Sequence, residues 1–325
     1  MIEVAAVVEN WATRGAFSIA RGVKHSVDVV IVRARAGERE GKGEGTPIYY
    51  RDQTAIGALE MLAALDDTPI DRTVLDQVLP PGAARNALDC ALWDLESKDS
   101  GMPVWALAGL ERPRALVTAL TLGLDTPGAM ERAARQVANR PLLKIKLGSD
   151  GGDGDRVAAV RLGAPGARLI VDANEAWEAL DIEAEAAAMA ALGVELIEQP
   201  VRSGHEEALD GVRSAVPLCA DESCHTRADL DRVAGRFQVI NIKLDKAGGL
   251  TEALALAAEA RARGLEVMVG CMLCTSLAIA PAMLVAQGAR WVDLDGPLLL
   301  ERDRERGLRF EDDGRVWPDD GGLWG

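Results

Sequence analysis

Short apolar runs alternate with helix-like segments over most of the chain after about residue 115. The strand-like runs begin near Ala115, Leu142, Ala167, Val194, Pro217, Gln238, Leu265 and Ala289. Amphipathic or alanine-rich stretches lie between them, at residues 127–137, 181–192, 250–262 and 276–287. About eight strand–helix units are the number expected for a closed (β/α)₈ barrel, and doubly wound sheets usually have fewer strands. The pattern therefore predicts an α/β fold with a TIM-type barrel over residues 113–300.

A different pattern precedes the barrel. Residues 2–9 and 27–36 alternate in polarity like antiparallel strands, and residues 55–65 and 83–98 are predicted to be helices. We expect residues 1–112 to form an α+β unit that folds against the barrel mouth. The polar, glycine-rich stretch 301–325 is predicted to pack back on this N-terminal unit.

Charged residues follow the apolar stretch at the ends of six of the strand-like runs. They are Lys144 and Lys146, Asp172 with Asn174, Glu198, Asp221 with Glu222, Lys243, and Asp293 with Asp295. Burying a charge there costs free energy unless the charge is paired or bound to a metal. Because the carboxyl ends of all barrel strands meet at one mouth, we expect these side chains to form a single active site.

Three of these charged residues are acids on consecutive strands. Asp172, Glu198 and Asp221 end the third, fourth and fifth strands. Three converging carboxylates cannot all stay ionised without a cation, and ligands that are all oxygen favour a hard ion such as Mg²⁺. We therefore predict a Mg²⁺ site, with Asn174 and Glu222 supporting the ligands.

The lysines flank this predicted metal site. Lys144 and Lys146 alternate along one strand and so project to the same face, where mutual repulsion lowers the pKa of at least one amine. Lys243 ends the sixth strand, on the far side of the barrel. Two amine bases around a carbon whose carboxylate binds the metal predict a two-base 1,1-proton transfer that inverts a stereocentre. Lys246, just beyond, is interpreted as a supporting or loop residue.

Asp293 and Asp295 share a face at the end of the eighth strand. Two carboxylates without metal partners of their own suit an ammonium group on a substrate. A helix cap combined with a structural ion pair is the alternative that the sequence leaves open.

Composition limits the partners. The 325 residues carry a formal net charge of -15, and no Lys/Arg cluster stands out, so nucleic acid and anionic membrane are poor partners. No apolar run is long enough to span a bilayer, and the first residues do not resemble a signal peptide. The five cysteines favour reduced thiols. We expect a cytoplasmic enzyme with a small-molecule substrate; a homo-oligomer is compatible with the sequence but not specified by it.

Nearly the whole chain resembles the muconate lactonizing enzyme subgroup of the enolase superfamily. The matching motifs are the Lys144-Ile145-Lys146 triplet, the three acids, and Lys243 within residues 241–246. Asp293-Leu294-Asp295 is similar to the motif of dipeptide epimerases, and residues 219–225 and 270–276 are similar to L-Ala-D/L-Glu epimerases. The resemblance implies a barrel with a capping domain and a Mg²⁺-dependent epimerisation of a dipeptide at its C-terminal residue, in murein peptide recycling.

The resemblance also implies roles for individual residues. Lys146 and Lys243 would be the bases, Lys144 would contact the substrate carboxylate, and Asp293 and Asp295 would hold the α-ammonium group. Residues 17–25 and 46–51 would be the specificity loops. The remaining residues of the expected substrate-binding set are Arg21, Lys24, Thr121, Cys271 and Met272. Arg21 and Lys24 are the candidate partners of an acidic substrate side chain.

One position departs from the family pattern. Close Ala-Glu epimerases carry a basic residue where this chain has Leu277, which weakens the case for a glutamate substrate. Other reactions of the scaffold need the lysines and the metal but no ammonium receptor: cycloisomerisation of a muconate-type lactone, o-succinylbenzoate synthesis and N-acyl amino acid racemisation. Retention of both lysines disfavours a non-catalytic barrel.

Overall fold

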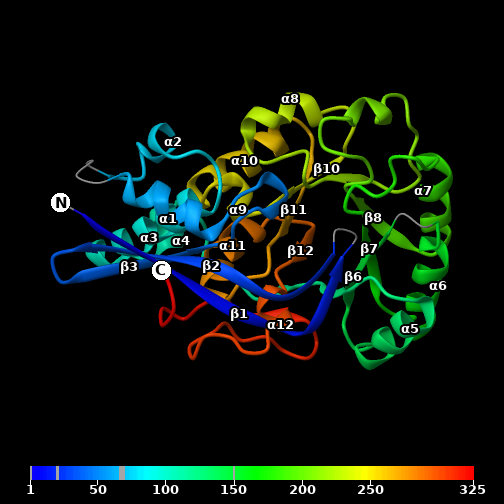
Figure 1. The fold of residues 1–325 in the computed structure, drawn as a ribbon, viewed down its shortest axis with the longest axis horizontal. Helices are drawn as coiled ribbons and strands as arrows, with labels where there is room; N and C mark the ends of the chain where they lie inside the picture. Colours follow the sequence, from blue (N-terminus) through cyan, green and yellow to red (C-terminus); the bar gives the residue numbers. More distant parts are fainter. Residues whose placement is uncertain (1, 20–21, 66–69, 149–150) are drawn as a thin grey trace.

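The structure is a computed structural model that describes residues 2–19, 22–65, 70–148 and 151–325. It combines a three-stranded antiparallel sheet near the N-terminus with an eight-stranded parallel sheet (Figure 1). The α/β class and the barrel with an N-terminal capping domain, both predicted from the sequence, are confirmed. None of the helices in the described part of the chain combines the length and apolar character that crossing a bilayer requires.

The capping domain is built on a long β-hairpin. Its strands are β1 (Glu3–Ile19), β2 (Gly22–Ala36) and β3 (Arg39–Gly45), in the order β1-β2-β3. The sequence predicted shorter strands at 2–9 and 27–36 and no strand at β3. The hairpin, dark blue in Figure 1, runs across to the barrel, where Leu124 N donates a hydrogen bond to Ser18 O at 3.0 Å. The expected loop 17–25 is therefore the end of this hairpin, because its strands stay paired as far as Ile19 and Gly22.

Helices α1 (Ala55–Ala63) and α3 (Ala83–Ser100) pack on one face of this sheet. The short helices α2 (Leu75–Val78) and α4 (Val104–Leu107) contact α3, and the 3₁₀ helix η1 lies at Tyr49–Arg51. Gly41, Gly43 and Gly45 alternate along β3, and a Cβ atom at each would collide with the backbone of α3. These three positions must lack a side chain because the helix lies directly on the strand.

The barrel strands follow one another in chain order around the sheet. They are β5 (Leu120–Leu122), β6 (Leu142–Lys146), β7 (Arg168–Asp172), β8 (Val194–Glu198), β9 (Leu218–Ala220), β10 (Val239–Ile242), β11 (Glu266–Gly270) and β12 (Trp291–Asp293). Ala119 N donates to Val292 O at 2.8 Å, which joins the last strand to the segment before the first and closes the barrel.

Helices and short turns connect the barrel strands. They are α5 (Pro127–Gln136), α6 (Asp153–Gly163), α7 (Ile182–Ala191), η2 (Glu206–Leu209), η3 (Arg227–Asp229), α8 (Leu230–Val233), α9 (Leu244–Ala247), α10 (Leu250–Ala262) and α11 (Ser276–Ala286), and α12 (Gly296–Leu299) follows the last barrel strand. Asp89 of α3 accepts hydrogen bonds from the backbone N–H and the hydroxyl of Thr251, at 3.0 and 2.6 Å. The capping domain thus supplies the acceptor at the first turn of α10.

The first barrel strand lies later than the sequence predicted. Leu116–Val117 (β4), near the expected start at Ala115, pairs antiparallel with β13 (Arg315–Val316) instead of joining the barrel. A partner some 200 positions away in the chain leaves no local signal, so the apolar run alone could not separate β4 from β5.

The C-terminal stretch contacts the N-terminal unit. Glu301 N donates to Ala12 O at 2.9 Å, and Trp324 Nε1 donates to Cys90 O at 2.9 Å. The capping domain is therefore completed by residues from the end of the printed sequence, as predicted.

Candidate active site

Strand alternation determines which side chains enter the barrel. One buried apolar residue from each wall fills the bottom of the interior: Ala119, Leu142, Ile170, Leu196, Cys219, Val239, Met268 and Trp291. Because every second residue of a strand faces the same side, the next inward positions lie two residues further on. Seven of the eight positions carry a polar side chain, namely Thr121, Lys144, Asp172, Glu198, Asp221, Asn241 and Asp293, and the eighth is Gly270. A polar layer therefore lies directly above an apolar layer, at the carboxyl ends of the strands.

The three predicted metal ligands come together. One oxygen each from Asp172, Glu198 and Asp221 lies within 4.8 Å of the others, and all three side chains are buried. Glu198 Oε2 and Asp221 Oδ1 accept no hydrogen bond from the described residues, and each lies at ion-pair distance from an ammonium group, 2.7 Å from Lys144 Nζ and 2.6 Å from Lys246 Nζ. Three buried carboxylates that group this closely and draw in positive charge fit a hard divalent cation such as Mg²⁺.

The pKa values of two triad carboxyl groups shift in opposite directions. Burial and the neighbouring Asp172 carboxylate raise the pKa of Glu198. Burial also opposes ionisation of Asp221, but the Lys243 and Lys246 ammonium groups outweigh it and hold the pKa of Asp221 well below its usual range. The carboxylates therefore compete for positive charge, as expected for a cation-binding cluster.

The two predicted bases lie on opposite walls. Lys146 Nζ is 2.6 Å from Asp172 Oδ2, and Lys243 Nζ is 2.6 Å from Asp221 Oδ2. Strands β6 and β10 are four places apart in an eight-stranded barrel, so their ends face each other across the mouth. Both lysines line the same pocket, and the three strands that carry the triad, β7, β8 and β9, lie between β6 and β10 in the sheet. This arrangement can present an amine to each face of one bound carbon atom.

Lys144 is more deeply enclosed than Lys146. Its Nζ lies 2.7 Å from Glu198 Oε2, 2.8 Å from Asp293 Oδ2 and 3.1 Å from Asp172 Oδ2. Burial disfavours its charge, but the Asp293, Glu198 and Asp172 carboxylates raise its pKa well above the ordinary lysine value. For Lys144 these acids outweigh the repulsion from the neighbouring lysine.

The eighth-strand aspartates lie beside β5. Asp295 Oδ2 accepts a hydrogen bond from Thr121 N at 2.6 Å, and Thr121 Oγ1 donates to Asp293 Oδ1 at 3.4 Å. Burial and the adjacent Asp293 carboxylate raise the pKa of Asp295 to about 7. All three residues line the pocket, so two carboxyl groups lie next to each other on this wall, one of them paired with Lys144.

The capping domain closes the pocket from above. Its contribution is Phe17, Ile19, Lys24, Tyr49 and Tyr50, and the barrel adds Cys271, Met272, Asn174 and Glu222. The Nζ of Lys24 lies 3.8 Å from the centroid of the Tyr49 ring. Arg21, the other predicted side-chain partner, lies outside the described residues. Leu277 is buried in the first turn of α11 and is not among the described residues that line the pocket.

Supporting residues that the sequence analysis missed lie just behind the ligands. Gln199 Oε1 accepts from Asp221 N at 2.8 Å and Ser223 N at 3.1 Å, and Asn241 Nδ2 donates to Glu198 Oε1 at 2.7 Å. Gln199 has a φ of 38°, a left-handed backbone conformation that is strained for a residue with a side chain. The signal was available, because Gln199 follows a predicted ligand and Asn241 occupies an inward position of its strand.

Comparisons with known proteins agree with this geometry. Residues 129–323 match an "Enolase C-terminal domain-like" family model, and residues 1–109 match the N-terminal domain of mandelate racemase / muconate lactonizing enzyme. An L-Ala-D/L-Glu epimerase from Escherichia coli (strain K12) is 42% identical over 93% of this chain and 95% of its own length. An N-acetyl-D-glutamate racemase from Pseudoalteromonas sp is 43% identical over 91% of this chain and 95% of its own.

Two similar solved structures contain a bound dipeptide. An enolase family member from Agrobacterium tumefaciens with homology to dipeptide epimerases, solved with sodium and L-Ala-L-Glu, is 45% identical over 100% of both chains, with a TM-score of 0.96. A dipeptide epimerase from Enterococcus faecalis V583, complexed with Mg and L-Leu-L-Tyr, is 29% identical over 99% of both chains, with a TM-score of 0.90. With both family models matched, this chain belongs to the mandelate racemase / muconate lactonizing enzyme group of the enolase superfamily.

Proposed function

We propose that this protein is a Mg²⁺-dependent dipeptide epimerase that inverts the α-carbon of the C-terminal residue, with L-Ala-D/L-Glu as its substrate pair. The observation that carries the proposal is the placement of Lys146 and Lys243. Each Nζ lies 2.6 Å from a carboxylate of the acidic triad, on opposite walls of one pocket. An isomerase activity accords with the epimerase and racemase names of the similar proteins.

The chain's own residues divide the chemistry. Asp172, Glu198 and Asp221 would hold Mg²⁺, which when bound supplies positive charge to offset the negative charge developing on the substrate carboxylate. The Nζ of one lysine takes the α-proton, and the Nζ of the other delivers a proton to the opposite face. Asp293 and Asp295 hold the dipeptide's α-ammonium group, and Lys144 orients its carboxylate.

The capping-domain side of the pocket offers a positive charge that suits a glutamate side chain. Lys24 from the hairpin would supply the positive charge that an acidic side chain requires, with Tyr49 fixing the position of its ammonium group. Leu277 is buried in α11 and supplies no charge to the site, so in this proposal Lys24 is the group that recognises the acidic side chain. We infer that its physiological role is the recycling of murein peptides in the cytoplasm.

The test is α-proton exchange in D₂O. Incubation with L-Ala-L-Glu and Mg²⁺ should replace the α-proton of the glutamyl residue by deuterium and produce L-Ala-D-Glu, both visible by proton NMR. Lys146→Met and Lys243→Met should each abolish inversion while leaving exchange of one epimer, because each removes the base on one face only. Absence of exchange across a library of dipeptides would overturn the proposal.

Racemisation of N-acylated glutamate is a second candidate. The 43% identity to an N-acetyl-D-glutamate racemase favours it. An N-acyl substrate carries no α-ammonium group and therefore has no use for two carboxylates on the β12 wall. Comparing kcat/KM for L-Ala-L-Glu and N-acetyl-L-glutamate on the same preparation separates the two reactions.

A further inference from the structure

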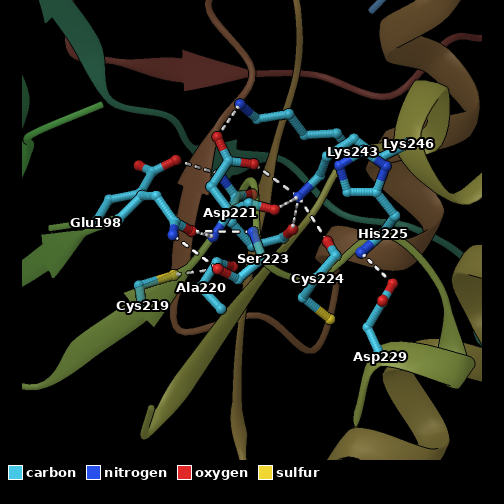
Figure 2. Close-up of polar contacts among 12 residues, drawn as sticks. Glu198, Cys219, Ala220, Asp221, Ser223, Cys224, His225, Asp229, Lys243 and Lys246 are labelled. Carbon is cyan, nitrogen blue, oxygen red and sulfur yellow. Dashed lines mark hydrogen bonds and ion pairs between the residues drawn. The ribbon is translucent and has the colours of Figure 1, made fainter. Parts of the chain in front are cut away.

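Lys246 lies behind the pocket, in α9, three residues after Lys243. Its side chain is 0% exposed, and among the described residues the pocket lining includes Lys243 but not Lys246. Its Nζ donates to the main-chain carbonyls of Asp221 at 2.6 Å, Asn241 at 2.8 Å and Cys224 at 2.9 Å (Figure 2). Three hydrogen bonds use the full donor capacity of an ammonium group. Lys246 therefore has no N–H left to offer a substrate.

The same ammonium group contacts a metal-ligand carboxylate. Lys246 Nζ is 2.6 Å from Asp221 Oδ1, while Lys243 Nζ is 2.6 Å from Oδ2 of the same side chain. Figure 2 shows the two lysines reaching Asp221 from different sides. A fully buried charge is tolerated only where surrounding groups compensate it, and here four oxygen atoms do so.

The three carbonyl acceptors belong to separate pieces of backbone. Asp221 follows β9, Cys224 lies in the turn beyond it, and Asn241 belongs to β10. Lys246 thus fastens the turn 221–224 to the neighbouring strand. The side chain of Asn241 in turn donates a hydrogen bond to Glu198. The hydrogen bonds that start at Lys246 therefore extend to a second ligand of the triad.

We propose that Lys246 is a positioning residue for the metal site, a built-in monovalent cation that fixes the turn 221–224 and thereby the orientation of Asp221. The identity of the metal rests on the proposed function. Lys246 takes no part in proton transfer. Its fixed charge also repels a divalent ion, which acts in the opposite direction. The positional effect dominates, because without the ammonium group three buried carbonyls lose their donors.

Lys246→Met tests whether positioning of Asp221 outweighs charge repulsion of the metal, because it keeps the aliphatic part of the side chain and removes the ammonium group. We expect the Mg²⁺ dissociation constant, measured by calorimetry, to rise about 10- to 100-fold, the range usual for groups that orient metal ligands. Saturating Mg²⁺ should restore kcat. Lys243→Met is the matched control, since it removes the ammonium group from the other oxygen of Asp221: Mg²⁺ binding is retained and inversion is lost.

Equal or tighter Mg²⁺ binding by folded Lys246→Met would overturn the proposal, and so would a loss of kcat that saturating Mg²⁺ does not restore. A second measurement compares the variant with wild-type protein, both without metal. Amide hydrogens of residues 221–224 should exchange faster in Lys246→Met; equal exchange rates would show that Lys246 does not order the turn, since Gln199 accepts from Asp221 N and Ser223 N in both proteins. Deuterium exchange of L-Ala-L-Glu on wild-type protein is run in parallel, and its absence would contradict the proposed function without affecting the Mg²⁺ comparison.

Discussion

The carboxylate of Glu44 accepts hydrogen bonds from both the backbone N–H and the hydroxyl of Thr275. The first spans 2.7 Å, and Arg304 donates to the same carboxylate at 2.9 Å. Glu44 lies on β3 of the capping domain, and Thr275 is the N-cap residue of α11. Because Cys271 and Met272 lie in the segment just before Thr275 and line the pocket, one buried carboxylate fixes both the seating of the capping domain and a wall of the site.

Replacing Glu44 by glutamine keeps the shape of the side chain but removes a charged acceptor and leaves Arg304 without this partner. We expect the free energy of unfolding to fall by about 1–3 kcal/mol, the cost of unpairing a buried polar group. KM should rise more than kcat falls, because the pocket wall loosens while the lysines stay in place. Urea unfolding and steady-state kinetics measure these effects. Glu40→Gln, which removes only a surface pair with Arg33 and Arg35, should change stability by less than about 1 kcal/mol.

Asp295→Asn tests the ammonium receptor while preserving an acceptor for the Thr121 amide. Losing a buried charge partner costs about 2–5 kcal/mol, so kcat/KM for L-Ala-L-Glu should fall by at least about 30-fold. The rate with N-acetyl-L-glutamate, which has no ammonium group, should fall far less. Asp293→Asn is a poorer probe because Asp293 also contacts Lys144 at 2.8 Å. Equal losses on both substrates would contradict the assigned role.

Lys24→Met should change side-chain preference without changing the chemistry. Removing one charge partner of an acidic side chain should lower kcat/KM for L-Ala-L-Glu by about 10- to 100-fold, or roughly 1.4–2.8 kcal/mol. The value for L-Ala-L-Met should stay level or rise. A matched variant is Lys42→Met, since Lys42 lies on β3 and is not among the described pocket residues. A parallel fall for both dipeptides would place Lys24 outside the specificity site.

Lys24 also predicts a pH dependence. Burial, together with repulsion from Lys146, lowers the pKa of Lys24 to about 8. Above this pH the free enzyme loses the charge, so kcat/KM for L-Ala-L-Glu should decline through pH 8 relative to L-Ala-L-Met. Between about pH 8 and 10.5 the unfolded chain holds more protons at this group than the folded chain, so its titration raises stability as pH increases. Both trends should vanish in Lys24→Met; a decline that persists there would assign the titration to another group.

Mg²⁺ should stabilise the fold through the acidic triad. A ligand at 100 times its dissociation constant adds about 2.7 kcal/mol to the free energy of unfolding when it binds only the folded state. The melting temperature should therefore rise with Mg²⁺ concentration and return on chelation. Glu198→Gln should remove most of the response, because it removes the negative charge of one of the three clustered carboxylates. An undiminished response in this variant would place the ion elsewhere.

The layout of the site was predictable because it depends on local alternation. Once Leu142 faces the barrel interior, Lys144 and Lys146 must do so as well, and the same count applies to Asp172 and Glu198. The strand ends that carry charge were therefore recognisable from the sequence before any fold was known.

What escaped prediction depends on contacts between distant segments. The pairing of β4 with β13, the hydrogen bonds from Thr275 to Glu44, and those from the turn after β9 to Gln199 each join residues that are not neighbours in the chain. Apolar periodicity carries no information about such partners. The length of the β1–β2 hairpin was missed for a related reason, because its mostly exposed outer half lacks strict alternation.

The glycine row on β3 makes the active site sensitive to mutation at a distance. A single methyl group at Gly43 would act as a wedge against Ala87 and lift α3 from the sheet. The same helix carries Arg85 and Asp89, which bind the barrel segment just after Lys243. A substitution at Gly43 would therefore lower turnover although Gly43 contacts no group that binds the substrate.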